Sequence, residues 1–173
     1  AFQKAIRSLE IGRSGPGLDR KIEAIPYEEL KQKVAFPSSE RFFHLYEAFK
    51  KGLSVDDAFK MTSIAKFFLG EIQELALFEL ELNKYTWMSL PDELLIKAKK
   101  FAFSDKYLAK FFNVSEKNIR ERRIKLGCVA TYCRVPVSGT ANGEDYYYST
   151  YSGRAAEVKV SDKRKIMILG GGP

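Results

Sequence analysis

The sequence predicts a mainly α-helical fold, a compact bundle of about eight short helices with an extended C-terminal tail ending in a β-strand. Apolar residues recur at helical spacing through most of the chain. Many of these segments start with Ser, Thr or Pro and several end with Gly, the residue types that begin and end helices. After Gly127, β-branched and aromatic residues typical of extended chain take over.

Proline, serine and glycine mark the helices expected in the first part of the chain. The first is expected to run from Phe2 to about Ile11, with Gly12 after it as the stop, because glycine commonly closes a helix. Pro26 suits the first turn of a short helix, and residues 37–40 open the next, which carries a broad apolar face. Ser54 and the acidic residues after it predict another capped short helix.

Four more helices are expected before Gly127. Thr62 or Ser63 caps the longest, in which apolar residues recur at helical spacing. Pro91 begins the next helix, and Ser104 and Ser115 are the expected N-caps of the last two. Helices this short are marginal in isolation, so we expect them to be stabilised by packing against one another.

The C-terminal tail is predicted to be extended. Residues 131–137 and 146–151 are β-branched or aromatic, and the segment 138–143 between them is a polar, glycine-containing loop. Residues 152–161 have the composition of a surface linker, and residues 165–169 read as a strand. A lone terminal strand has no pairing partner, so we expect the chain to be a fragment of a longer polypeptide.

Composition excludes few functions. A net charge of +7 allows an anionic partner without requiring one, and 45% hydrophobic residues are ordinary for a globular protein. Cys128, Cys133 and the single His44 lack the spacing of a zinc site. Two free thiols suit a reducing compartment, so we expect a cytoplasmic location. There is no apolar run long enough to predict a membrane span.

A helix-turn-helix pattern spans residues 108–120 and has two interpretations. Ala109 is small where two helices approach, Asn113 suits the left-handed turn, and Ser115 suits the following N-cap. In a basic protein this pattern is consistent with a DNA-binding module. The outer face offers Lys117, Asn118, Glu121, Arg122 and Lys125. The bulky phenylalanines before the turn and the acidic residues on the second helix favour the alternative, a packing unit of an all-α domain.

No other group of residues predicts an active site. Glu71, Glu74, Glu79 and Glu81 lie on one expected helix, where a solvated face is a simpler interpretation than a catalytic carboxylate pair. His44 has apolar neighbours and is expected to pack in a partly buried position. We therefore predict no catalytic, cofactor-binding or metal-binding residues in this chain.

Four segments, taken in order, resemble the large subunit of carbamoyl-phosphate synthase. They are residues 2–10, residues 52–69, residues 98–123 and residues 147–173. Each segment alone is weak, but their order and spacing are specific and cover nearly the whole chain. The resemblance implies the helical oligomerisation domain that lies between two ATP-grasp synthetase halves, and it favours the packing interpretation of the helix-turn-helix pattern.

The resemblance also implies a domain organisation. Residues 1–12 would close the preceding ATP-grasp half, 13–127 would form the oligomerisation domain, 128–163 a linker, and 164–173 the first strand and glycine turn of the following half. The parent enzyme makes carbamoyl phosphate from bicarbonate, glutamine-derived ammonia and two ATP, with Mg²⁺ and K⁺, for arginine and pyrimidine synthesis. Its catalytic residues lie outside this segment.

The implied partners are the ATP-grasp halves of the same chain, a glutaminase small subunit and other large subunits, with neither nucleic acid nor membrane. The segment from Leu18 to Val34 is the predicted subunit contact, because it carries Leu18, Ile22, Ile25 and Leu30 without an obvious helical stripe. Exposed apolar patches are expected at the two ends of the chain, around Phe2, Ile6 and Leu9 and around Ile166, Ile168 and Leu169.

The sequence departs from the family pattern at two places. Ala65 and Phe67 stand where Asp and Trp are usual, and residues 133–139 replace a usual run with a slightly shorter loop. We expect that region to pack differently here.

Overall fold

The structure is a computed structural model that describes residues 1–135, 146–153, 155–158 and 161–166. It separates into two units, Ala1–Val129 and Ala130–Pro173, and each is described by itself. We call them the helical unit and the hairpin unit. The mainly α-helical prediction is confirmed.

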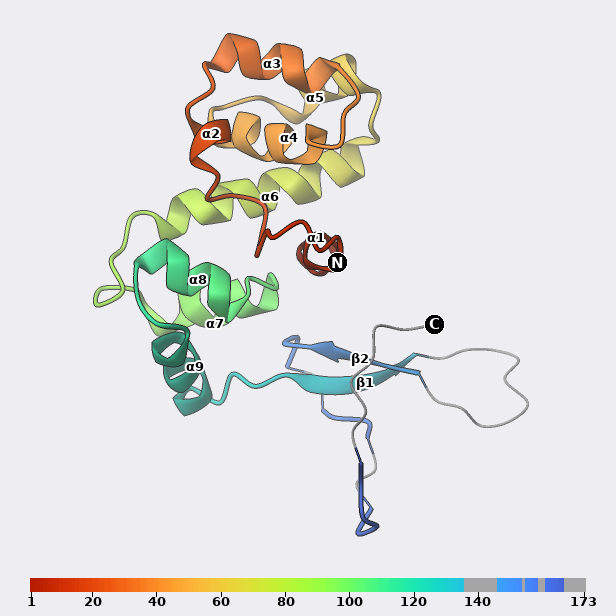
Figure 1. Cartoon of the computed structure of the whole chain (residues 1–173), viewed down its shortest axis with the longest axis vertical. Coiled ribbons are helices and arrows are strands. Elements are labelled where there is room, and N and C mark those ends of the chain that lie inside the picture. Colours follow the sequence, from red (N-terminus) through yellow and green to blue (C-terminus); the bar gives the residue numbers. More distant parts are fainter. Residues whose placement is uncertain (136–145, 154, 159–160, 167–173) are drawn as a thin grey trace, which may run out of the picture. The chain divides into compact units, whose positions relative to one another are not determined.

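The helical unit contains nine helices (Figure 1). They are α1 Phe2–Ser8, α2 Arg20–Glu23, α3 Tyr27–Ala35, α4 Arg41–Lys50, α5 Val55–Thr62, α6 Lys66–Leu82, α7 Asp92–Lys100, α8 Asp105–Phe112 and α9 Glu116–Lys125. The sequence predicted about eight. The additional helix is α2, a single turn whose first backbone N–H groups are bound by the side chain of Asp19.

The predicted serine caps at the starts of three helices are confirmed. The side chains of Ser54, Ser104 and Ser115 accept hydrogen bonds from backbone N–H groups in the first turns of α5, α8 and α9, at 3.0–3.1 Å. The prediction for the start of α6 was wrong. Thr62 ends α5 and Ser63 follows it in the left-handed conformation, so α6 begins only at Lys66, with no side-chain cap at Ala65.

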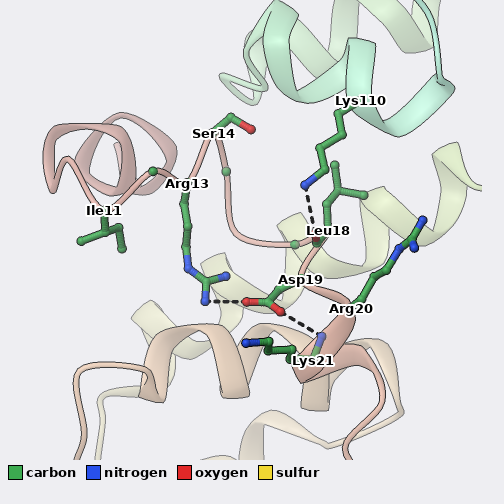
Figure 2. A pocket seen from close by; sticks show the side chains of 11 residues that line it. Ile11, Arg13, Ser14, Leu18, Asp19, Arg20, Lys21 and Lys110 are labelled. Atoms are coloured by element: carbon green, nitrogen blue, oxygen red, sulfur yellow. Dashed lines mark hydrogen bonds and ion pairs between the residues drawn. The ribbon is translucent and has the colours of Figure 1, made fainter.

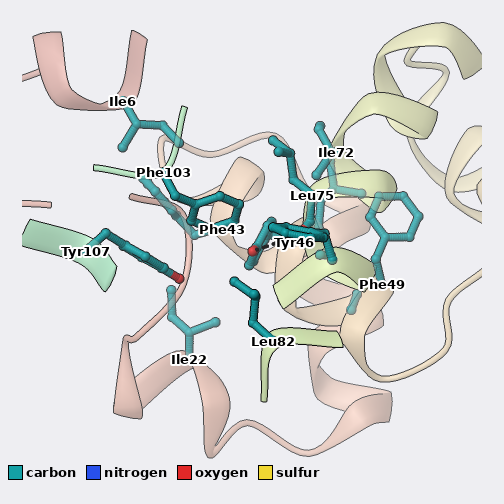
Figure 3. Packing of buried hydrophobic residues seen from close by; sticks show 14 of the residues in the cluster. Ile6, Ile22, Phe43, Tyr46, Phe49, Ile72, Leu75, Leu82, Phe103 and Tyr107 are labelled. Atoms are coloured by element: carbon teal, nitrogen blue, oxygen red, sulfur yellow. Dashed lines mark hydrogen bonds between the residues drawn. The ribbon is translucent and has the colours of Figure 1, made fainter. Parts of the chain in front are cut away.

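The long helix α6 organises the helical unit. Figure 1 shows α2–α5 on one side of α6, and α7–α9 on the other side, below its C-terminal half. α4 packs against α3 and α6, α5 packs against α3 and α6, and α8 packs against α9. The buried aromatic and aliphatic side chains form one cluster, part of which is drawn in Figure 3. Its largest fully buried members include Tyr46, Phe49, Phe103 and Tyr107.

The first helix and the loop after it bind to the α7–α8 region. The Gln3 amide donates to the Phe101 carbonyl at 3.2 Å, and the Arg7 guanidinium donates to the Ala102 carbonyl at 3.1 Å. Ile6 is buried in the same core. The exposed patch expected around Phe2, Ile6 and Leu9 is therefore largely wrong, because among these three only Leu9 is mostly exposed.

The hairpin unit contains two antiparallel strands, β1 Thr131–Val135 and β2 Tyr146–Thr150, with Cys133 opposite Tyr148. The Glu157 backbone N–H donates to the Tyr132 carbonyl at 2.9 Å, so the chain after β2 returns to β1. The expected loop at 138–143 lies outside the described residues. The strand expected at 165–169 is described only at its first two residues, which are not in a strand. Of the apolar patch expected around Ile166, Ile168 and Leu169, Ile166 is 91% exposed and the other two lie outside the described residues.

Candidate functional site

A surface pocket with a volume of about 600 Å³ lies where the loop before α2 meets α2 and α8 (Figure 2). Most of its lining comes from the chain between Ile11 and Lys21, and Lys110 of α8 completes it. We call this the loop pocket. The Ser104 hydroxyl donates to the Ser14 carbonyl at 3.2 Å, and the Lys110 ammonium donates to the Leu18 carbonyl at 3.3 Å. These two bonds attach the loop to α8 and the residue before it.

Arg13 and Asp19 form an ion pair that holds the loop in place. The Arg13 guanidinium lies 2.7 Å from a carboxylate oxygen of Asp19 and 2.9 Å from one of Glu40, and 3.9 Å above the Phe43 ring. Partial burial acts to raise the pKa of Asp19. Hydrogen bonds from the Lys21 and Ile22 backbone N–H groups, together with the Arg13 charge, outweigh it and lower that pKa below its usual value.

A buried carboxylate lies beneath the loop. Glu79 of α6 is only 2% exposed. The Tyr46 hydroxyl donates to its Oε2 at 2.7 Å, the Tyr107 hydroxyl donates to the same oxygen, and the Lys50 ammonium lies 3.0 Å from its Oε1. Lys50 also lies 3.1 Å from Glu47. We call these five residues the Glu79 cluster.

The loop approaches the Glu79 cluster so closely that it requires glycine. A Cβ atom on Gly17 would lie 2.6 Å from the Tyr107 hydroxyl and 2.7 Å from a Glu79 oxygen. A Cβ on Gly15 would lie 2.4 Å from the Tyr107 ring. The glycines of this loop therefore allow the backbone to lie directly on α6 and α8.

Burial and charge keep the two phenols of the cluster neutral. Burial raises the pKa of Tyr46 and of Tyr107 well above the ordinary value, and the negative charge of Glu79 raises both further. Burial acts to lower the pKa of Lys50, but Glu79 and Glu47 outweigh it and the net shift is upward. A carboxylate with three donors, two of which are neutral phenols, holds α4, α6 and α8 together.

The sequence analysis missed this cluster. Glu71 and Glu74 are exposed as predicted, but Glu79 is not. Glu79 follows Leu75 by four residues and precedes Leu82 by three, so it lies on the apolar stripe of α6. That spacing is the signal that could have identified it.

The predicted subunit-contact residues face the interior of the helical unit to different degrees. Leu30 is 0% exposed and Ile22 is buried, whereas Leu18 and Ile25 are partly buried and pack against the core. Two of the four side chains thus stabilise the helical unit from within. The short helix α2 and the first turns of α3 supply the apolar arrangement that the sequence did not reveal.

The helix-turn-helix pattern forms the expected helix pair. Asn113 has the left-handed conformation, with φ 52°, and Ile119 is fully buried. Arg122, one of the side chains offered for base contacts, instead binds the 87–92 segment: its guanidinium lies 2.7 Å from Asp92 and donates to the Trp87 and Leu90 carbonyls. That use of Arg122 is typical of a packing unit.

Two further observations concern the part of the chain that the structure describes. It contains no group of three or more His, Cys, Asp or Glu residues placed to hold a metal ion. Nor does any helix in the described residues reach the length and apolar character needed to span a membrane. The geometry on these residues is that of a packed helical domain with a basic pocket.

Comparison with known families agrees with this architecture. Residues 1–127 match the model described as the carbamoyl-phosphate synthetase large chain, oligomerisation domain. The chain belongs to this family. The match includes α1, which the sequence analysis had assigned to a preceding domain, and it includes the helix-turn-helix pair.

Curated relatives match the chain over its whole length. It is 37% identical over 179 residues to the carbamoyl phosphate synthase large chain of Archaeoglobus fulgidus and 39% identical over 178 residues to that of Pseudomonas aeruginosa. It is 36% identical over 177 residues to the arginine-specific large chain, chloroplastic, of Arabidopsis thaliana. Each match spans the whole of this chain but only 15–16% of the length of the relative.

Proposed function

We propose that this chain works as the non-catalytic oligomerisation domain of a large chain that makes carbamoyl phosphate from bicarbonate, glutamine-derived ammonia and two ATP. The observation that carries the proposal is the family match over residues 1–127, together with relatives aligned across the whole chain. The described residues add a packed helical unit in which the only deeply buried acidic cluster is occupied by structural donors.

The same proposal assigns cofactors and partners outside this chain. ATP, Mg²⁺ and K⁺ would bind the ATP-grasp halves, and a glutaminase small subunit would supply ammonia. The product would serve arginine and pyrimidine synthesis in the cytoplasm, and neither nucleic acid nor a membrane would be a partner. One matched relative is named as arginine-specific, which supports the first of these two routes.

A domain exchange tests this function. The matched segment of the Pseudomonas aeruginosa large chain would be replaced by this chain, and carbamoyl phosphate formation and oligomeric state would be measured. We expect both to be retained. The matched control is the same exchange carrying Leu30→Glu, which should abolish assembly because Leu30 is in the core. A soluble exchanged enzyme that assembles no better than this control would contradict the proposal.

The isolated chain should hydrolyse no ATP. Pure chain assayed with ATP and Mg²⁺ should show phosphate release no greater than a heat-inactivated sample. ATP hydrolysis that co-purifies with the folded chain would contradict this prediction.

The DNA-binding alternative predicts a different result. A specific module should bind one DNA site at physiological salt in the presence of competitor DNA. We expect only weak binding that disappears as salt is raised, because Arg122 is engaged and Ile119 is buried. Binding that survives competition would restore the alternative.

The subunit contact in the segment from Leu18 to Val34 stays a prediction. Because Leu30 and Ile22 are buried, its solvent-facing part is polar and includes Glu28 and Glu29 of α3. Sedimentation of the chain with Glu28→Arg and Glu29→Arg tests it, and Glu71→Arg with Glu74→Arg on α6 is the control. We expect the first pair to weaken self-association and the second pair to leave it unchanged. A monomer at all concentrations would refute this contact.

A further inference from the structure

The loop pocket carries an excess of positive charge that the oligomerisation role does not explain. Its lining contains Arg13, Arg20, Lys21 and Lys110, with Asp19 as the only acidic lining residue. These side chains come from the loop, from α2 and from α8. From this arrangement we propose that the loop pocket binds a small phosphate-bearing anion.

The acidic residue of the pocket is already fully engaged. One oxygen of the Asp19 carboxylate pairs with Arg13, and the other accepts from the backbone N–H groups of Lys21 and Ile22. Arg13 is neutralised in turn by Asp19 and by Glu40. This pairing fixes the loop. The three groups together carry one net negative charge, so with Arg20, Lys21 and Lys110 the net charge is +2.

Three cations of the lining then lack an acidic partner. Within the described residues, no Asp or Glu side chain forms an ion pair with Arg20, Lys21 or Lys110. Figure 2 shows Lys110 reaching toward the loop from α8, with its ammonium near the Leu18 carbonyl. Each of the three is exposed, so a ligand can reach it without the helical unit opening.

The ligand class follows from this charge and from the size of the pocket. A volume of about 600 Å³ exceeds what one carboxylate fills and lies within the range of small-molecule sites. The positive lining of the pocket favours an anion that carries more than one negative charge. Phosphate offers oxygens for both the planar fork of arginine and the point charge of lysine.

The recognition would be made by side chains and not by a helix terminus. The first N–H groups of α2 are occupied by Asp19, so they are not available to an anion. Binding through exposed Arg and Lys side chains is screened by salt. The proposal does not rest on the activity of the longer chain, since only residues of this chain form the pocket.

Titration of the complete 173-residue chain with pyrophosphate tests the proposal, with binding followed by calorimetry and by backbone amide chemical shifts. We expect saturable binding at low salt, with shift changes concentrated between Ile11 and Lys21. The triple variant Arg20→Gln, Lys21→Gln, Lys110→Gln should bind at least about tenfold more weakly. Its thermal unfolding should fall only slightly, because all three side chains are exposed and the one described bond that is lost is the 3.3 Å bond from Lys110 to the Leu18 carbonyl.

A matched variant controls for net charge. Lys117→Gln, Arg120→Gln and Lys125→Gln remove three exposed positive charges from α9, away from the pocket lining. We expect its affinity to stay within about twofold of the parent. Equal weakening in both variants would overturn the proposal, since it would show unspecific attraction to a basic surface.

Citrate and inorganic phosphate complete the test. A binding pocket for phosphate groups should prefer pyrophosphate and phosphate to citrate, which carries similar charge on carboxylates. Equal affinity for citrate would overturn the assignment to phosphate, and so would the absence of saturable binding by any of the three anions. A failure here would leave the domain-exchange result unaffected, so the two proposals fail separately.

Discussion

The helical unit and the hairpin unit differ in how many apolar side chains they bury. The helical unit buries a continuous cluster of apolar side chains from all of its long helices and satisfies one deeply buried carboxylate with three donors. In the hairpin unit, Cys133 is the one buried hydrophobic side chain of the described residues, and the tyrosines of β2 are 40–58% exposed. A two-stranded hairpin is marginal in water. The helical unit therefore supplies its own core, whereas the two strands need further contacts to become stable.

The largest effect on stability is expected when a charge is placed in the helical unit, and the same change in the hairpin unit is the comparison. Leu30→Glu would bury an unpaired carboxylate, which costs several kcal/mol, comparable to the whole stability of a domain. We expect it to abolish the helical circular dichroism signal. Tyr148→Glu in β2 should leave that signal unchanged, because Tyr148 is 40% exposed in the hairpin.

A control just after the same helix separates burial from charge. Phe36 follows α3 directly and is 73% exposed, so Phe36→Glu should keep the chain folded. If Leu30→Glu folded as well as Phe36→Glu, the helical unit would not possess the core described above.

A smaller effect is expected where the loop lies on the Glu79 cluster. Gly17→Ala places a Cβ within 2.6–2.9 Å of Tyr107 and Glu79, which are buried and packed. We expect a loss of about 1–3 kcal/mol in the free energy of unfolding. Denaturant unfolding measures it, with an unchanged slope showing that the effect is on stability.

The matched substitution is Gly70→Ala in the middle of α6. No atom lies within 4 Å of the added Cβ, and alanine favours the helix, so this variant should gain about 0.5–1 kcal/mol. The opposite signs of the two Gly→Ala changes are the expected result. A loss at both positions would mean that the close approach of the loop is not what makes Gly17 necessary.

The Glu79 cluster also predicts a dependence of stability on alkaline pH. The pKa values of Tyr46 and Tyr107 are raised in the folded chain, whereas in the unfolded chain tyrosine titrates near its ordinary value of about 10. A raised folded pKa gives stability that is fully present below about pH 10 and is lost as the pH rises through the folded pKa. We expect the helical unit to weaken steeply above about pH 10.

Tyr107→Phe should make that alkaline loss shallower. At neutral pH it should also cost about 1–3 kcal/mol, because the Glu79 carboxylate loses a donor while still buried. Tyr132→Phe, at an exposed position of β1, is the control and should change neither quantity. An unaltered pH profile in Tyr107→Phe would show that other groups cause the alkaline loss.

The sequence predicted the helices better where their signals were local. The serines before α5, α8 and α9 and the left-handed Asn113 act within one or two turns, so their residue types suffice to place them. α2 was missed because it is one turn long and has no periodicity to read. Ser63 was misassigned because a serine suits both the start of one helix and the left-handed end of another.

The candidate sites were harder to predict because they depend on contacts between distant segments. Glu79 is 32 residues beyond Glu47 and 28 before Tyr107, and nothing local marks the three as neighbours. The basic loop pocket joins Lys110 to residues 11–21 in the same way. The hairpin register, with Cys133 opposite Tyr148, likewise depends on which segments pair and not on either strand alone.

A small effect is also expected at the longest helix, α6, which has no side-chain cap. Ala65 has an extended backbone, with φ −52° and ψ 134°, and α6 has no acidic residue in its first turn. Ala65→Asp should supply a side-chain oxygen that accepts from a first-turn N–H group. It should gain about 1 kcal/mol in the free energy of unfolding.

Ala65→Asn separates capping from charge at the same position. Asn accepts the same bond without adding a negative charge beside the Lys66–Asp56 ion pair, whose ammonium and carboxylate lie 2.6 Å apart. Similar gains in both variants would assign the effect to the cap, and a larger gain with Asp would add the helix dipole and Lys66. No gain in either would show that the start of α6 is already satisfied by its packing. The helical unit would then depend less on local caps, and more on its shared core, than the comparison with the hairpin unit implies.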